Sequence, residues 1–222
     1  LQHAHSHLAA SGTRKPIEDI TGEFIRLLHQ QELSDNDLAL YSKRGIEALE
    51  AFLSAKYGTF TPSQKPELSF AGQGVVLGQA RLTGSLDLVD IDNQTITVTD
   101  YKTGKPSTSW TGKSDYEKIK LHKYRQQLMF YELLCANSRD YAKYDFGGAV
   151  LQFVEPDSRG DICQLDDRFS CDELADFQRL IAAVWRCITT LELPDISNYQ
   201  ANYRGMTQFE KDLISSEYPA RE

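Results

Sequence analysis

The chain has 222 residues, of which 41% are hydrophobic and 25% are charged, a length and composition that suit one large globular domain. The net charge of −8 argues against a protein that coats nucleic acid generally, for which a basic balance is expected. No apolar run approaches the roughly 20 residues of a membrane span, and no signal peptide opens the chain, so we expect a cytoplasmic protein.

Helical patterns occupy the first third of the chain. Apolar residues recur at helical spacing over residues 17–31. They do so again in a second helix, which Ser34 or Asp35 can cap and which runs to about Lys56. We therefore predict an N-terminal helical part over residues 1–62.

The next part of the chain is rich in β-branched residues. Strands are predicted at 67–70 and 74–80, followed by a hairpin whose alternating arms run to Lys102. A loop follows, and the pattern then predicts a helix, a strand, a helix and a short helical tail over 116–136, 146–154, 171–191 and 209–214. This order predicts an α/β (α+β) fold with a small mixed central sheet flanked by helices, in which residues 63–222 form the core and the C-terminal helices of one domain.

The four cysteines stand at long and irregular gaps without a C-x-x-C pair, so we expect neither a zinc finger nor an iron–sulfur cluster. Cys135 and Cys187 lie in apolar helical context, which predicts buried thiols. The chain also lacks the glycine-rich motifs of P-loop and dinucleotide-binding proteins.

The hairpin is predicted to place two carboxylates opposite each other. If the turn falls at residues 93–94, Val89 faces Val98 and Asp87 faces Asp100 on the same side of the two strands. Directly opposite residues have Cβ atoms roughly 4.5–5.5 Å apart. Two like charges at the end of an apolar face are costly unless something binds there, and a divalent cation would remove the cost.

Asp87, Asp100 and Lys102 together indicate metal-assisted hydrolysis. Mg²⁺ takes oxygen ligands, often one or two carboxylates plus water and substrate phosphate, and the carbonyl of Tyr101 would add another oxygen. Lys102 would orient or deprotonate a water, or stabilise charge on a phosphate. Glu67, ahead of an apolar strand, is a further candidate ligand, although an exposed strand-entry glutamate explains it equally well. A surface charge cluster at a strand end is the alternative for the whole group.

The charge reverses locally between residues 102 and 125. Seven lysines and arginines stand there against only Asp115 and Glu117. A solvated loop is one interpretation of such a run, and a surface that tracks a nucleic-acid backbone is the other. The candidate DNA contacts are Lys105, Lys113, Lys120, Lys123 and Arg125.

These residues resemble the core of the PD-(D/E)XK nucleases. Gly84-Ser-Leu-Asp87, followed by Thr99-Asp-Tyr-Lys-Thr-Gly-Lys105, is similar to the G-x-x-D and D-Y-K-T-G-K elements of the RecB-like branch. That branch is found fused to UvrD/Rep-type helicases and in AddAB-type repair enzymes. Gln127-Leu-Met-Phe-Tyr131 matches its Q-x-x-x-Y element. The resemblance covers residues 67–155 and implies a restriction-endonuclease-like core.

The resemblance implies cleavage of DNA phosphodiesters with Mg²⁺ or Mn²⁺. Asp87 and Asp100 would bind the metal and Lys102 would be the catalytic lysine. Gln127 and Tyr131, four residues apart on one helix face, would form part of the active-site wall. A polar residue and a half-buried tyrosine on an amphipathic helix are the alternative for that pair. The implied substrate is DNA, expected to be single-stranded ends for an exonuclease.

The resemblance also implies a partner, namely a helicase domain in the same parent chain, acting in DNA repair or recombination. The tail over residues 202–214 resembles the C-terminal part of such helicase–nuclease chains. We therefore expect the chain to be the nuclease domain of a larger protein. No membrane partner is expected.

A histidine is the point at which the sequence departs from this branch. Its members often carry a metal-binding histidine near the start of the domain, after a G-T-x-x-H-like stretch. This chain begins with three histidines and lacks that preamble. We expect either that one of them serves, with His3 and His7 as candidates, or that the true ligand precedes Leu1. A polar helix end is the alternative for all three.

Two other functions stay open. A DNA-binding or docking module with a decayed site would bind DNA without hydrolysing it and would not respond to Mg²⁺. A metal phosphoesterase for small molecules suits the long basic segment less well, because that segment fits a polymer better than a compact ligand.

Overall fold

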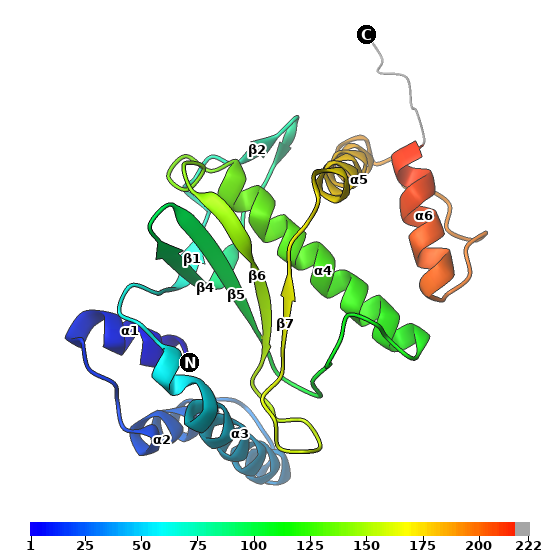
Figure 1. Cartoon of the computed structure of the whole chain (residues 1–222). Helices are drawn as coiled ribbons and strands as arrows, with labels where there is room; N and C mark the ends of the chain where they lie inside the picture. Colours follow the sequence, from blue (N-terminus) through cyan, green and yellow to red (C-terminus); the bar gives the residue numbers. More distant parts are fainter. Residues whose placement is uncertain (216–222) are drawn as a thin grey trace. The chain divides into compact units, whose positions relative to one another are not determined.

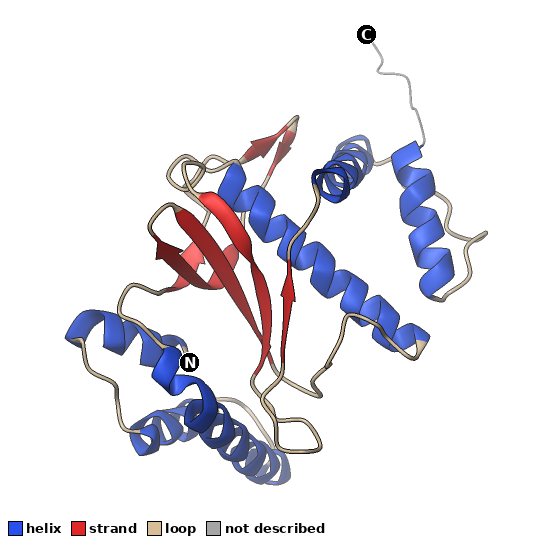
Figure 2. Cartoon of the chain, in the orientation of Figure 1, coloured by secondary structure: helices blue, strands red, loops and turns tan. Residues whose placement is uncertain are grey.

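Helices and strands are mixed along the chain, as the sequence predicts (Figure 2). The computed structural model describes residues 1–215. Its elements are α1 (Gln2–Ser11), α2 (Ile17–Leu28), α3 (Asp35–Lys56), η1 (Tyr57–Thr59), β1 (Lys65–Ser69), β2 (Val76–Leu77), β3 (Ala80–Arg81), β4 (Ser85–Asp92), β5 (Thr95–Lys102), α4 (Asp115–Ala136), β6 (Asp145–Phe153), β7 (Gln164–Asp167), α5 (Cys171–Thr190) and α6 (Tyr203–Ser215) (Figure 1). No helix among these residues is long and apolar enough to cross a membrane. The predicted mixed α/β class is confirmed.

Contacts divide the chain into two units, each built from separate segments. The first unit comprises residues 1–68, 85–108 and 149–166, and the second comprises residues 69–84, 109–148 and those from 167 on. A five-stranded sheet, hydrogen-bonded in the order β1-β4-β5-β6-β7, lies largely in the first unit. The predicted helical part over residues 1–62 falls within that unit.

The hairpin of β4 and β5 has the predicted register. Val89 pairs with Val98, Ile91 pairs with Ile96, and the turn falls at residues 93–94. The side chains of Val89 and Val98 are fully buried, which fixes the register because a one-residue slip would turn them to the other face. The same register, continued by one residue past the pair of Leu88 and Thr99, places Asp87 opposite Asp100.

The N-terminal helices pack on the end of this hairpin. Ser34 caps α3 by accepting a hydrogen bond from the N–H of Asp37, as the sequence predicts. The helices share a core with Tyr57 of η1 and with Phe60 and Val154, which follow η1 and β6, and Tyr101 of β5 packs against it. The buried members of this core are Ala4, Leu8, Ile20, Phe52, Leu53, Tyr57, Phe60 and Val154. It therefore holds α1 beside the end of β5.

Among residues 1–215, the second unit contains the helices α4, α5 and α6. Capping boxes open α4 at Ser114 and α5 at Ser170. A small cluster of Ala183, Cys187 and Leu213 joins α5 to α6. Cys135 and Cys187 are buried and free, so the prediction of buried thiols is confirmed.

The elements differ from the expected ones at three places. The predicted strand over 74–80 is instead a small hairpin, in which Val76 pairs with Arg81. Gly78 turns the chain there with a φ of 59°, a conformation that glycine adopts easily. The strand β7 was not predicted, because its sequence is short and polar and only Leu165 is buried. The helix α6 begins at Tyr203, well before the predicted start at residue 209.

Candidate active site

Two carboxylates and an ammonium group meet at one end of the β4–β5 hairpin. Asp100 is buried, and its Oδ2 lies 2.6 Å from Nζ of Lys102. Asp87 Oδ2 accepts a hydrogen bond of 2.9 Å from the backbone N–H of Tyr101. The structure therefore brings together the four hairpin residues that the sequence singled out.

The electrostatics of this group favour a further cation. Burial raises the pKa of Asp87, and the neighbouring charge of Asp100 raises it further, while the Tyr101 N–H and Lys102 oppose the rise. Asp100 is buried and Asp87 is partly buried, and the Lys102 ammonium group lies beside Asp100. A second positive charge would stabilise both in their ionised form.

A cavity of about 650 Å³ opens beside this group within the first unit. Its size is typical of binding sites for small ligands. Asp87, Tyr101, Gly104, Glu67 and His5 line it. Glu67 has a φ of 50°, which is uncommon for a residue other than glycine. The candidate ligand Glu67 therefore shares a cavity with Asp87.

His5 is the residue that sequence reasoning did not select. Its side chain is 1% exposed, its ring stacks on Phe60 with centroids 3.8 Å apart, and its Nε2 lies 3.0 Å from the hydroxyl oxygen of Tyr101. Burial lowers the pKa of His5 to about 4. The imidazole is therefore neutral near pH 7, the form in which histidine binds metals.

The two histidines that the sequence favoured lie elsewhere. His3 is exposed and pairs with Glu23 at 2.7 Å, and neither His3 nor His7 lines the cavity. The sequence feature that could have distinguished His5 from His3 and His7 is the helical spacing of the apolar residues in α1. The buried positions of α1 are Ala4, His5 and Leu8, which recur at the helical spacing that places His3 and His7 off this face.

The predicted glutamine–tyrosine pair is formed on α4. Gln127 Nε2 donates a hydrogen bond of 2.7 Å to the hydroxyl oxygen of Tyr131, whose side chain is buried. Both residues lie in the second unit, whereas Asp87 and Asp100 lie in the first. Their place in an active-site wall stays a prediction.

Most of the candidate DNA contacts are solvent-accessible. Lys105, Lys113 and Lys123 are exposed, while Lys120 lies partly buried with its Nζ 5.5 Å from the ring centroid of Tyr124. Exposed ammonium groups of this kind attract a polyanion.

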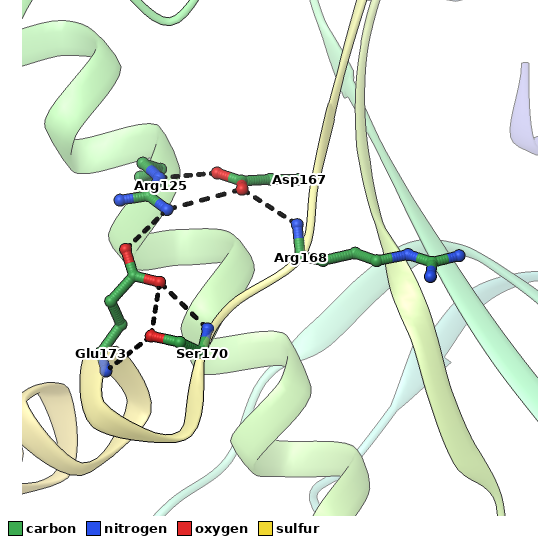
Figure 3. Close-up of polar contacts among 5 residues, drawn as sticks. All are labelled: Arg125, Asp167, Arg168, Ser170 and Glu173. Atoms are coloured by element: carbon green, nitrogen blue, oxygen red, sulfur yellow. Dashed lines mark hydrogen bonds and ion pairs between the residues drawn. The ribbon is translucent and has the colours of Figure 1, made fainter.

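Two carboxylates bind Arg125 (Figure 3). Its Nε lies 2.6 Å from Oδ2 of Asp167, and its Nη2 lies 2.9 Å from Oε1 of Glu173. Glu173 is also the partner of Ser170 in the capping box of α5. Arg125 therefore ties α4 to the first turn of α5, which accounts for this residue without a DNA contact.

The oxygen atoms at the hairpin fit a divalent metal ion that binds few protein ligands. Within residues 1–215, no group of three or more His, Cys, Asp or Glu side chains is arranged to hold a metal ion. Mg²⁺ commonly uses only one or two protein carboxylates and completes its shell with water and phosphate oxygens. Asp87 and Asp100, with the carbonyl of Tyr101, have the chemistry of such a site.

One comparison with known proteins agrees with the sequence motifs. A family model described as the PD-(D/E)XK nuclease superfamily matches residues 1–203. The crystal structure of SSO0001 is similar with a TM-score of 0.37 and 12% sequence identity, over 94% of this chain and 98% of that chain. The search of curated proteins found no match.

Proposed function

The chain belongs to the PD-(D/E)XK nuclease superfamily, and from this premise we propose that it is a metal-dependent nuclease that hydrolyses phosphodiester bonds of DNA. The observation that carries the proposal is the buried Asp100, paired with Lys102 at 2.6 Å, at the hairpin end that also holds Asp87. A buried charge cluster of this kind is costly for folding alone, which favours a catalytic role.

Each side chain has a distinct task in this proposal. Asp87 and Asp100 would hold a divalent cation, Mg²⁺ or Mn²⁺, which when bound supplies Lewis-acid chemistry and a more acidic water. Lys102 stabilises negative charge on the phosphate oxygens as it develops. The Tyr101 N–H fixes the orientation of the Asp87 carboxylate. Glu67 and the neutral His5 are the further candidate ligands in the same cavity.

The finer parts of the proposal concern substrate and context. We assign the chain to the RecB-like branch, on the strength of its G-x-x-D, D-Y-K-T-G-K and Q-x-x-x-Y elements. The substrate is then single-stranded DNA delivered by a helicase domain of the same parent protein, in repair or recombination. Gln127 and Tyr131 would contribute to the active-site wall. Lys105, Lys113, Lys120 and Lys123 would follow the DNA backbone, with Arg125 contributing less because it is already paired.

Cleavage of labelled DNA tests this function. The wild-type protein is incubated with single-stranded and duplex DNA in Mg²⁺, in Mn²⁺ and in EDTA. We expect cleavage only with a metal, and we expect Asp100→Asn and Lys102→Met to abolish it. Asp92→Asn, at the exposed end of β4, is the matched control. The assignment is wrong if Asp100→Asn or Lys102→Met cuts DNA at the wild-type rate.

One observation favours a second function, a module that binds DNA without cutting it. The Lys102 ammonium group lies 2.6 Å from Asp100 and already compensates its charge. Such a module would bind DNA equally well in EDTA and in Mg²⁺, and it would release no product. Fluorescence anisotropy of labelled DNA, measured beside the cleavage assay, separates the two functions.

A further inference from the structure

A phenylalanine ring lies directly on the backbone of α3. A Cβ atom added to Gly45 would stand 2.2 Å from Cζ and 2.4 Å from Cε1 of the Phe24 ring. Only glycine leaves room for the ring in this position. Gly45 lies near the middle of a 22-residue helix, where glycine weakens the helix. The close approach of Phe24 therefore gives this glycine a reason to be there.

The same ring forms part of the wall of the active-site cavity. Phe24 is half-buried, and it lines the cavity together with Leu28, Leu49 and Tyr41. Tyr41 is 42% exposed. The cavity thus combines an apolar and aromatic wall, built from α2 and α3, with the carboxylates of Asp87 and Glu67.

This combination matches the chemistry of a nucleotide. A nucleotide carries a phosphate, which suits a metal-binding carboxylate group, and a flat base, which suits an aromatic ring. In a duplex the faces of the bases are covered by their neighbours, whereas an unpaired base can stack on a protein side chain. Stacking on an aromatic ring accepts every base, because each base has a π-face.

We propose that Phe24, seated on Gly45, is a stacking platform for an unpaired base of the DNA strand whose phosphate lies at Asp87 and Asp100. The proposal rests on the proposed nuclease function and adds a base-binding subsite to it. Tyr41, on the same wall, is the second aromatic residue of the subsite.

Binding of modified strands tests the subsite without cleavage. The probe is a fluorescein-labelled single strand, compared with strands of the same length in which abasic residues replace the nucleotides in successive windows, all in EDTA. One of these abasic windows should remove the base that stacks on Phe24. We expect the wild-type protein to bind the base-bearing strand about 5- to 100-fold more tightly than the strand with that window. Phe24→Ala should lose this preference while binding the abasic strand like the wild type.

Further variants keep the test independent of folding. Phe24→Leu retains apolar volume but not the ring, and it should lose most of the preference. Gly45→Ala displaces the ring and should do the same. Leu27→Ala is the matched control, because Leu27 is on the same helix and does not line this cavity. Thermal unfolding confirms that each variant is folded.

The outcomes separate this proposal from the nuclease function. Equal binding of base-bearing and abasic strands by the wild type overturns the subsite, even where metal-dependent cleavage is observed. A base preference that survives Phe24→Leu and Gly45→Ala in folded protein overturns it as well. Absence of metal-dependent cleavage overturns the nuclease function, while the binding comparison still decides whether the ring holds a base.

Discussion

Lys102 and Asp100 form an ion pair of 2.6 Å in which the side chain of Asp100 is 2% exposed and that of Lys102 is 18% exposed. Two residues apart on one strand, they point to the same face of the sheet. The pair therefore serves the fold as well as the proposed chemistry, because a carboxylate buried this deeply needs a positive partner.

Replacing Lys102 by methionine should destabilise the protein by about 3–5 kcal/mol, because it removes the cationic partner of a buried carboxylate. The double variant Asp100→Asn with Lys102→Met removes both charges and should recover most of that stability. Neither protein should cleave DNA. Urea unfolding and the cleavage assay, run on the same preparations, check this. Cleavage by the stable double variant would show that the pair has only a structural role.

His5 should be the N-terminal histidine on which activity depends. His5→Phe keeps an aromatic ring to stack on Phe60 but removes both imidazole nitrogen atoms. We expect cleavage to fall at least about 10-fold, the usual cost of losing a group that supports a metal site. His3→Gln and His7→Gln, which alter side chains outside the cavity, are the matched controls. Equal effects of all three substitutions would contradict a special role for His5.

A clamp of three residues holds the loop that follows β5. Arg44 binds the carboxylate of Glu155 through contacts of 2.8–3.0 Å, and Glu155 in turn accepts a hydrogen bond from the N–H of Gly104. Gly104 has a φ of 93°, so the loop has a conformation that few other residues would adopt. The clamp lines the active-site cavity and fixes the chain just after Lys102.

Arg44→Met should loosen this loop and lower kcat/KM for DNA by about 10-fold, with a loss of only about 1 kcal/mol in stability. The neighbouring substitution Lys43→Met is the control, because Lys43 makes only an exposed pair with Glu47 at 4.0 Å. Steady-state kinetics and urea unfolding of both variants distinguish the two positions. If the two variants have the same kcat/KM, the clamp does not position the loop.

The sequence predicts the hairpin well because its information is local. Alternation of β-branched residues and the turn at 93–94 determine which residues face each other, and Ser34 is a local cap signal. The pairing of Asp100 with Lys102 follows from the period of a strand. These features need no knowledge of the rest of the fold.

Other features could not be predicted because distant segments determine them. His5 was missed because α1 is short and mostly polar, so the helical spacing of Ala4 and Leu8 is a weak signal, and because Phe60 and Tyr101, which contact the imidazole, come from distant segments. The partners of Arg125 likewise come from two other elements, Asp167 from β7 and Glu173 from α5. The basic segment over residues 102–125 therefore could not show, from the sequence alone, that Arg125 binds carboxylates of other elements.

Glu132 on α4 should make stability depend on pH. Burial raises the pKa of this carboxyl group to about 7, from an ordinary value near 4.5. Between pH 4.5 and about pH 7, Glu132 in the native protein holds a proton that the unfolded chain has lost. Stability should therefore fall as pH rises from about 4.5 to 7 and should stay lower above that range.

Glu132→Gln removes this titration and imitates the protonated group. We expect the variant to be more stable than the wild type by about 1–2 kcal/mol at pH 8 and to be nearly equal to it at pH 5, because Glu132 is only partly buried. Glu50→Gln, on the exposed face of α3, should change neither value. Urea unfolding of the three proteins at both pH values provides the measurement. A difference between the wild type and Glu132→Gln that does not change with pH would mean that this carboxyl group titrates normally in the folded protein.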